Sequence, residues 1–342
     1  LIRMSFVFKD MREINGQSGG GQILRSALTL SAITGDNFRI ENIRGSRSNP
    51  GLKRQHIECV KAAARLCDAK VEGVEMGSET IVFKPGNVRN ESFSVNIGTA
   101  GSISLLLDTV MPITTQFDER FRIDVKGGTD VRWSPPIASQ KAKAELLNSF
   151  GADFDLQLIR TGYYPKGNGE VRLNAGVSDL EEITLMNRGA LRKFEICSKA
   201  SEDLEENKVA DRQADEVARM LKNDYPSIEI GKDVEYVETD SSGSTIVLKA
   251  VYEDSITVFD QLGERGKRSE QVAKDVYKEF SEFEKTDAAV DARLADQLMI
   301  YVALVGGKLN ISEVTEHIQT NLETIRKFDF DLELNGKIIE KR

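Results

Sequence analysis

The sequence predicts an α+β fold in which one supersecondary unit occurs three times and a small α/β domain interrupts the series. Each unit consists of an apolar helix, an alternating strand, a second helix and a strand-rich stretch. The units begin near residues 19, 98 and 288. A repeated unit indicates a fold built by stacking equivalent parts, in which extra length is an insertion. The function must then depend on residues that differ between the units.

The first unit shows the pattern most clearly. Apolar residues recur with helical spacing over 20–34, and residues 38–43 alternate as in a half-buried strand. A second helix is predicted over 52–67, after a proline and a glycine that mark its start. Residues 71–75 and 80–84 then resemble a hairpin.

The second and third units repeat this order. Their predicted helices are 101–114, 135–150, 287–304 and 315–328, and their predicted strands are 121–125, 154–159, 169–173, 308–311 and the stretch to the C-terminus. The long segment 181–267 before the third unit contains strand-like runs and a helix of its own, at 193–197, 208–223, 245–251 and 257–259. We therefore predict a large three-repeat domain over 1–180 and 268–342, and a small inserted α/β domain over 181–267.

The bulk composition excludes several classes of protein. The net charge of −9 and the sequence pI of about 5.1 argue against bulk electrostatic coating of long nucleic acid, although a local basic pocket remains compatible. The longest uninterrupted apolar run, 298–305, is too short to span a bilayer, so we expect no membrane partner. The first residues lack the features of an export signal, and the three cysteines show neither disulfide nor metal-ligand spacing. We expect a cytoplasmic protein.

Two stretches of the first unit are candidates for binding phosphate. Gly19-Gly20-Gly21 precedes a helix, whose N-terminal N–H groups suit an anion, and Arg25 follows one turn later. Residues 44–56 contain four basic residues and a histidine but no acid. One arginine guanidinium can donate two parallel hydrogen bonds to two oxygens of a phosphate. Each stretch also has an alternative interpretation without a ligand. The three glycines could serve only to permit a tight turn, and residues 44–56 could form a basic loop that only contacts solvent.

His317 is the candidate nucleophile. It lies in the first turn of a predicted helix, beside the apolar stripe, where the positive helix end keeps an imidazole neutral. A lone histidine is more often structural or solvent-facing, so this alternative stays open. Asp130, Asp296 and Gln297 are further polar candidates, and Asp296 fits an exposed helical position equally well.

Together these segments resemble the RNA 3′-terminal phosphate cyclase family. The matching motifs, in order from about residue 13 to the C-terminus, are GGGQILR (19–25), IRGSR (43–47), PGLKRQH (50–56), GTAGS (98–102), GGTD (127–130), YYPKGNG (163–169), LADQL (294–298) and HIQTN (317–321). The resemblance implies a large domain of three βαβαββ-like repeats with a small inserted domain. It also implies an ATP-dependent, ligase-type enzyme that converts an RNA 3′-phosphate to a 2′,3′-cyclic phosphate through a histidine–AMP intermediate and an RNA-adenylate.

The resemblance also implies roles for individual residues. The catalytic residues would be His317, Arg25 and Arg47. The nucleotide-binding residues would be Asp108, Arg293, Leu294, Ala295, Asp296 and Gln297. The substrate-binding residues would be Arg44, Gln55, His56, Gly20 and Gly21. ATP and a divalent cation, Mg²⁺ or Mn²⁺, would be required, and RNA 3′-phosphate ends would be the partner.

The chain departs from the family pattern at two positions. Gln17-Ser18 stands where the family usually has a glutamate associated with catalysis and metal, and Asp108 stands where a nucleotide-contacting glutamine is expected. The metal ligands are therefore left unassigned, and the charge of Asp108 would repel ATP phosphates unless it meets a cation or points to the sugar or base. Two other functions remain: a cyclase-like RNA-binding protein that is not adenylated, and a small-molecule enolpyruvyl transferase. The sequence leaves open whether the chain forms a homo-oligomer.

Overall fold

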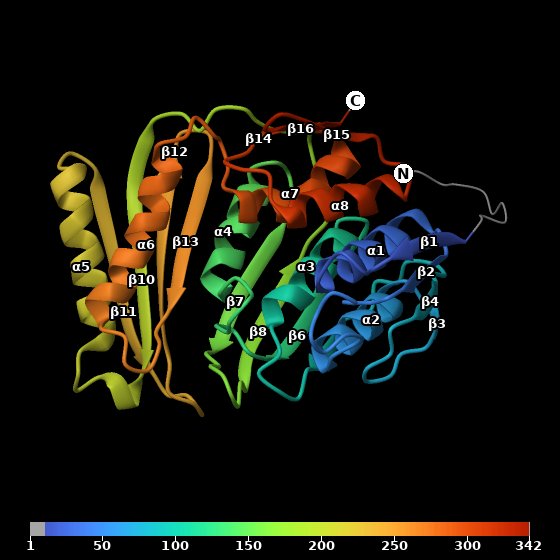
Figure 1. Ribbon diagram of the computed structural model, residues 1–342, viewed down its shortest axis with the longest axis horizontal. Helices are drawn as coiled ribbons and strands as arrows, with labels where there is room; N and C mark the ends of the chain where they lie inside the picture. Colours follow the sequence, from blue (N-terminus) through green and yellow to red (C-terminus); the bar gives the residue numbers. More distant parts are fainter. Residues whose placement is uncertain (1–10, 342) are drawn as a thin grey trace.

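Three four-stranded sheets with the same strand order form most of the molecule. The computed structural model describes residues 11–341, and Figure 1 shows the three repeats on one side of an additional unit. In each repeat the first strand pairs in parallel with the second, the second is antiparallel to the fourth, and the fourth is antiparallel to the third. The predicted α+β fold of repeated βαβαββ units is therefore confirmed.

The first repeat contains β1 (Arg12–Asn15), α1 (Gly21–Thr34), β2 (Phe38–Glu41), α2 (Arg54–Leu66), β3 (Lys70–Glu72) and β4 (Ile81–Lys84). The second contains β5 (Phe93–Asn96), α3 (Ile103–Thr114), β6 (Phe121–Gly127), α4 (Ile137–Asn148), β7 (Phe154–Arg160) and β8 (Gly169–Ala175). The third contains β9 (Ile183–Leu185), α7 (Ala292–Val305), β14 (Gly307–Asn310), α8 (Glu316–Arg326), β15 (Leu332–Asn335) and β16 (Ile338–Lys341). A short 3₁₀ turn, η1 (Glu202–Leu204), lies outside the repeats.

The inserted unit is a fourth sheet covered by helices. It contains β10 (Leu191–Ser201), α5 (Val209–Asp224), β11 (Glu229–Val237), β12 (Ser244–Tyr252), β13 (Ile256–Leu262) and α6 (Ser269–Glu284). The strand order is β11-β10-β12-β13. Helices α5 and α6 pack on this sheet, and α4 of the second repeat packs against β13 and β12, so the sheet separates the two helix layers in Figure 1.

Two segments lie on the other side of the boundaries that the sequence suggested at 181 and 267. Strand β9 pairs in parallel with β14, so it is the first strand of the third repeat. Helix α6 buries Val272, Val276 and Phe280 in the same hydrophobic core as Phe194, which belongs to the inserted sheet. The insertion therefore interrupts the third repeat between β9 and α7. A three-residue strand and an amphipathic helix carry too little sequence signal to be assigned to one sheet or the other.

The helices of the three repeats share one hydrophobic core. Helix α1 packs against α2, α3 and α8, and α7 packs against α3 and α8. Side-chain caps hold several of the helix N-termini: Ser102, Asp291 and Thr315 accept backbone N–H groups at the starts of α3, α7 and α8. Among the helices of residues 11–341, none combines the length and the apolar character that a membrane span requires.

Candidate active site

The start of α1 is open to a ligand and is surrounded by basic side chains. Its N-cap, Gly20, provides no side-chain cap, and the first turn contains no acid. A Cβ atom on Gly20 would lie 3.1 Å from an Arg47 guanidinium nitrogen. One on Gly21 would lie 2.5 Å from Nε2 of His56 and 3.0 Å from Nη1 of Arg25. Glycine is therefore required at Gly21, because these groups approach the backbone more closely than a side chain would allow.

His56 is buried at the first turn of α2. Its Nδ1 accepts a hydrogen bond from the backbone N–H of Lys53 at 3.0 Å, which caps that helix. Burial, together with Arg25, Arg44 and Lys53, lowers the pKa of His56 to about 3. The ring is therefore neutral at physiological pH, with Nε2 beside Gly21 and Arg25. The substrate-binding role implied for His56 stays a prediction, whereas the structure shows that it orders this helix start.

The arginines of this cluster differ in whether their guanidinium groups have hydrogen-bond partners within the protein. Nη1 of Arg44 donates to the carbonyl oxygens of Asn49 and Gly51 at 2.9 Å, so Arg44 shapes the loop that contains it. Within residues 11–341, the side chains of Arg25 and Arg47 make no hydrogen bond and no ion pair with a carboxylate, and the Arg47 backbone N–H donates to the carbonyl oxygen of Arg44. Their guanidinium groups are therefore available to an anionic ligand.

Gln55 connects the first repeat to the second. Its Oε1 accepts the backbone N–H of Ser102 at 3.2 Å, at the start of α3. A Cβ atom on Gly98 would lie 3.1 Å from the Arg54 guanidinium, so this loop also lies against the first turn of α2. The glycine-containing motifs of two repeats, separated by about eighty residues along the chain, therefore border one basic region.

His317 lies in the first turn of α8, with its side chain 53% exposed. Its Nδ1 is 4.0 Å from Oδ2 of Asp296 on α7. Asp296 accepts a hydrogen bond from Nδ2 of Asn321 at 2.6 Å, and Oδ1 of Asn321 accepts from Oγ of Ser26 on α1 at 2.6 Å. This chain of hydrogen bonds fixes the position of the carboxylate relative to three helices.

Asp296 also links His317 to the basic cluster. Burial raises the pKa of Asp296, although the Asn321 hydrogen bond and the neighbouring His317 and Arg25 favour its charged form. The carboxylate thus interacts electrostatically with both the imidazole and the Arg25 guanidinium. His317 is neither sealed in the interior nor remote from the arginines.

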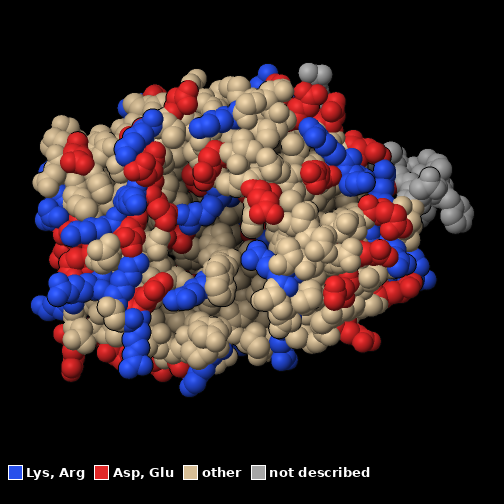
Figure 2. All heavy atoms as spheres, in the orientation of Figure 1, with Lys and Arg blue, Asp and Glu red and all other residues tan. Residues whose placement is uncertain are grey.

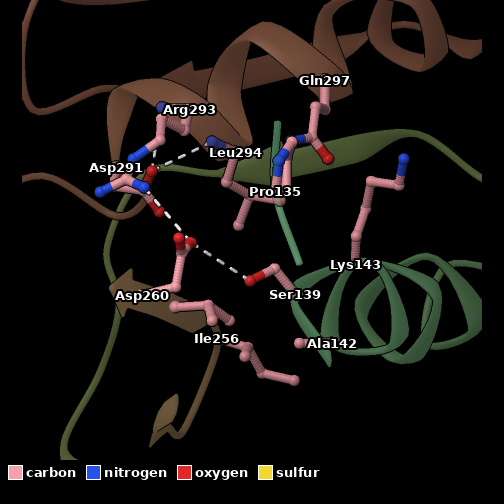
Figure 3. Close-up of a pocket in the computed structure, with 11 residues that line it drawn as sticks. Pro135, Ser139, Ala142, Lys143, Ile256, Asp260, Asp291, Arg293, Leu294 and Gln297 are labelled. Atoms are coloured by element: carbon pink, nitrogen blue, oxygen red, sulfur yellow. Dashed lines mark hydrogen bonds and ion pairs between the residues drawn. The ribbon is translucent and has the colours of Figure 1, made fainter. Parts of the chain in front are cut away.

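The side chains of residues 293–297 lie on different faces of α7 and have different surroundings. Arg293, Leu294 and Gln297 line a cavity of about 30 Å³ between α4, β13 and α7, together with Pro135, Ser139, Lys143 and other residues (Figure 3). Ala295 is completely buried in the hydrophobic core, and Asp296 lies toward His317. The cavity has room for about one water-sized molecule, so a nucleotide must widen it or extend beyond it.

Asp108 on α3 is paired with a buried cation. Nζ of Lys143 and Nε2 of Gln140, both on α4, donate to its Oδ1 at 2.6 Å and 2.9 Å. The Lys143 side chain is only 2% exposed, and Asp108 also interacts electrostatically with Asp296. The negative charge that departs from the family pattern is therefore compensated within the protein.

Lys143, Asp260 and Asn321 also lie at this site, although the sequence pattern did not single them out. Lys143 follows Gln140 by three residues on the buried side of α4, and a lysine on an apolar stripe was the available signal. Burial raises the pKa of Asp260 to about 6, against the effect of Arg293, whose Nη1 lies 3.3 Å away. Asp130, a candidate from the sequence, is buried and accepts the Thr129 hydroxyl at 2.6 Å, which is a structural position.

No group of three or more histidine, cysteine, aspartate or glutamate side chains in residues 11–341 is arranged to hold a metal ion. At the position where the family has a glutamate, the Gln17 side chain packs against Gly45, and the backbone carbonyl oxygen of Gln17 accepts the backbone N–H of Ser46. These residues do not form a protein-only metal centre.

Figure 2 shows a hollow near the middle of one face, with both basic and acidic side chains around its rim. A half-exposed imidazole beside a carboxylate, next to helix N-termini and unpaired arginines, defines a site suited to phosphate chemistry.

Comparison with known proteins identifies the family. The profile of the RNA 3′-terminal phosphate cyclase family matches residues 16–333. A protein of Halobacterium salinarum named RNA 3′-terminal phosphate cyclase is 38% identical over 336 residues, which cover 95% of this chain and 96% of the relative. Proteins of the same name from Saccharolobus solfataricus and Saccharolobus islandicus are 41% and 40% identical, over 96% of this chain and 97% of each relative. The chain belongs to the RNA 3′-terminal phosphate cyclase family, whose members are ligase-type enzymes.

Proposed function

We propose that this enzyme uses ATP to convert an RNA 3′-phosphate into a 2′,3′-cyclic phosphate, with His317 as the nucleophile. The observation that carries the proposal is the accessible His317 imidazole, held near Asp296 and, through that carboxylate, near the free Arg25 guanidinium. An accessible nucleophile next to fixed positive charge is what nucleotidyl transfer requires.

In the first step, Nε2 of His317 attacks the α-phosphorus of ATP. Asp296 lies on the Nδ1 side of the ring, which favours the proton on Nδ1 and leaves the lone pair on Nε2. A phosphorus–nitrogen bond to AMP forms and pyrophosphate leaves. Arg25, Arg47 and the N-terminus of α1 stabilise the charge on the phosphate oxygens.

Two further displacements complete the reaction. An oxygen of the RNA 3′-phosphate attacks the AMP phosphorus, and the bond to His317 breaks. The neighbouring 2′-hydroxyl then loses its proton and attacks the activated 3′-phosphorus, so that the cyclic phosphate forms and AMP leaves. AMP is a better leaving group than an oxide ion, which explains why ATP is consumed.

A divalent cation belongs to this proposal as a partner of the triphosphate. Mg²⁺ commonly binds through one or two carboxylates together with substrate phosphates, so the lack of a protein-only cluster in the described residues is compatible with it. The cavity beside Arg293, Leu294 and Gln297 is the proposed position for part of the nucleotide. Three free cysteines support a reducing compartment such as the cytoplasm.

The first experiment labels the protein with ATP that carries ³²P at the α-position, in the presence of Mg²⁺ or Mn²⁺. We expect an acid-labile, alkali-stable label that His317→Ala abolishes and that Gln319→Ala, an exposed change on the same helix, retains. Wild-type protein plus ATP should also make a 3′-phosphorylated oligoribonucleotide resistant to phosphatase. A His317→Ala protein that still becomes labelled would exclude His317 as the nucleophile. An unlabelled wild type that binds RNA would favour the non-adenylated RNA-binding function.

A further inference from the structure

Trp133 presents a large aromatic side chain to solvent. It is the only tryptophan of the sequence, and 94% of its surface is exposed. Its backbone φ is +62°, in the left-handed region that a bulky residue rarely occupies. Such a conformation persists only when the surroundings impose it, and it concentrates at functional sites.

The loop that presents Trp133 is held on several sides. Backbone N–H groups of Thr129 and Ile137 donate to the carbonyl oxygens of Gly162 and Thr129, at 3.0 Å and 3.1 Å. Asp130 pairs with Tyr163 in an isolated β-bridge. Arg132 forms an ion pair with Glu264 of the inserted unit at 3.3 Å. The loop is therefore ordered, and the exposed indole is displayed by a rigid support.

A second aromatic side chain comes from the neighbouring loop. Tyr164, next to the bridged Tyr163, is 74% exposed. In residues 11–341, Trp133 and Tyr164 are the aromatic members of the large exposed apolar side chains.

Both loops lie against the same segment of the active site. Gly128 donates its N–H to the carbonyl of Gly101 at 2.8 Å, and a Cβ on Gly167 would lie 2.8 Å from Cα of Ala100. This segment starts α3 and contacts Gln55 on α2. Two residues beyond Trp133, Pro135 lines the cavity beside α7. The two aromatic side chains therefore extend from loops that border the basic cluster.

We propose that Trp133, with Tyr164, is a stacking platform for nucleobases of the single-stranded RNA that enters the site with its 3′-end. This inference rests on the proposed function and names residues that would hold its substrate. Single-stranded RNA is commonly bound by aromatic rings that stack on its bases, next to basic groups that hold the phosphates. A protein partner would need a contiguous apolar patch, whereas a polar loop with an ion pair surrounds Trp133.

The single tryptophan makes binding directly observable. We expect a short 3′-phosphorylated oligoribonucleotide to quench the intrinsic tryptophan fluorescence in a saturable way, while ATP alone leaves it unchanged. Filter binding of the same labelled oligoribonucleotide measures the affinity independently. RNA that binds on the filter without changing the fluorescence, or equal quenching by ATP alone, would overturn the proposal.

Activity measurements then separate this proposal from the function itself. We expect Trp133→Ala to raise KM for the RNA about tenfold, with kcat and labelling by ATP unchanged, and Trp133→Phe to stay near wild type. Val177→Ala is the matched control, because Val177 is also an exposed apolar side chain, at 56%. It lies just after the C-terminal end of β8, whereas the Tyr164 loop precedes the N-terminal end of that strand at Gly169. An unchanged KM in Trp133→Ala would refute the platform and leave the cyclase proposal intact. If the wild-type protein is not labelled by ATP, the cyclase proposal is refuted instead. The fluorescence titration would then still test whether the protein binds RNA.

Discussion

The buried neutral His56 makes a quantitative prediction about the acid sensitivity of the protein. In the folded protein its pKa is about 3, whereas an unfolded histidine has a pKa of about 6.5. Between these values the unfolded chain binds a proton that the folded chain does not, so protonation favours unfolding. Stability from His56 is complete above about pH 6.5 and is lost as the pH falls toward 3.

The magnitude follows from the size of this pKa shift. At pH 5 the solution is about 1.5 pH units below the pKa of the unfolded histidine, at about 1.4 kcal/mol per unit, so His56 costs about 2 kcal/mol relative to pH 7.5. His56→Gln removes the titrating group, and its amide oxygen replaces Nδ1 as the acceptor for the Lys53 N–H. The free energy of unfolding of the variant should therefore fall by about 2 kcal/mol less than that of wild type between pH 7.5 and pH 5.

Urea unfolding followed by far-ultraviolet circular dichroism at the two pH values measures this difference. Only the change between the two pH values is diagnostic, because the substitution also alters packing at every pH. His317→Gln, which removes the other histidine of the sequence from a half-exposed position, is the matched control. A parallel loss of stability in wild type and His56→Gln would refute the conclusion that the basic cluster and burial keep His56 neutral.

Two further predictions concern contacts around the site. Lys143→Met should destabilise the protein by about 3 kcal/mol in urea unfolding, because it leaves the Asp108 carboxylate without its cation, and Asp108→Asn in the same chain should restore most of the loss; a double variant no more stable than the single one would contradict this. Gly21→Ala should displace His56 and cost about 1–3 kcal/mol, whereas Gly231→Ala, where the nearest atom to the new Cβ is 3.6 Å away, should be tolerated. Equal stability of these two alanine variants would show that the space at Gly21 is not tight.

Much of the repeat structure could be predicted from local patterns. Helix α1 was expected over 20–34 and lies at Gly21–Thr34, and α3 was expected over 101–114 and lies at Ile103–Thr114. These helices carry clear apolar spacing and glycine boundaries. Strand β11 and helix α6 were not predicted. The solvent-exposed, largely polar β11 gives little apolar alternation, and nothing local indicates which core α6 joins.

The sequence by itself determined the repeats, the family and the identity of the candidate residues, because periodicity and motifs are properties of neighbouring positions. Only the tertiary structure decided that Asp108 pairs with the buried Lys143 and that His56 caps a helix. It showed that Ala295 faces the hydrophobic core while the next residue, Asp296, lies beside His317. It also decided that the strand at Ile183–Leu185 belongs to the third repeat. Each of these facts depends on contacts between residues far apart in the chain. Burial and charge at such contacts are set by the packing of whole helices and sheets, and no local pattern contains them.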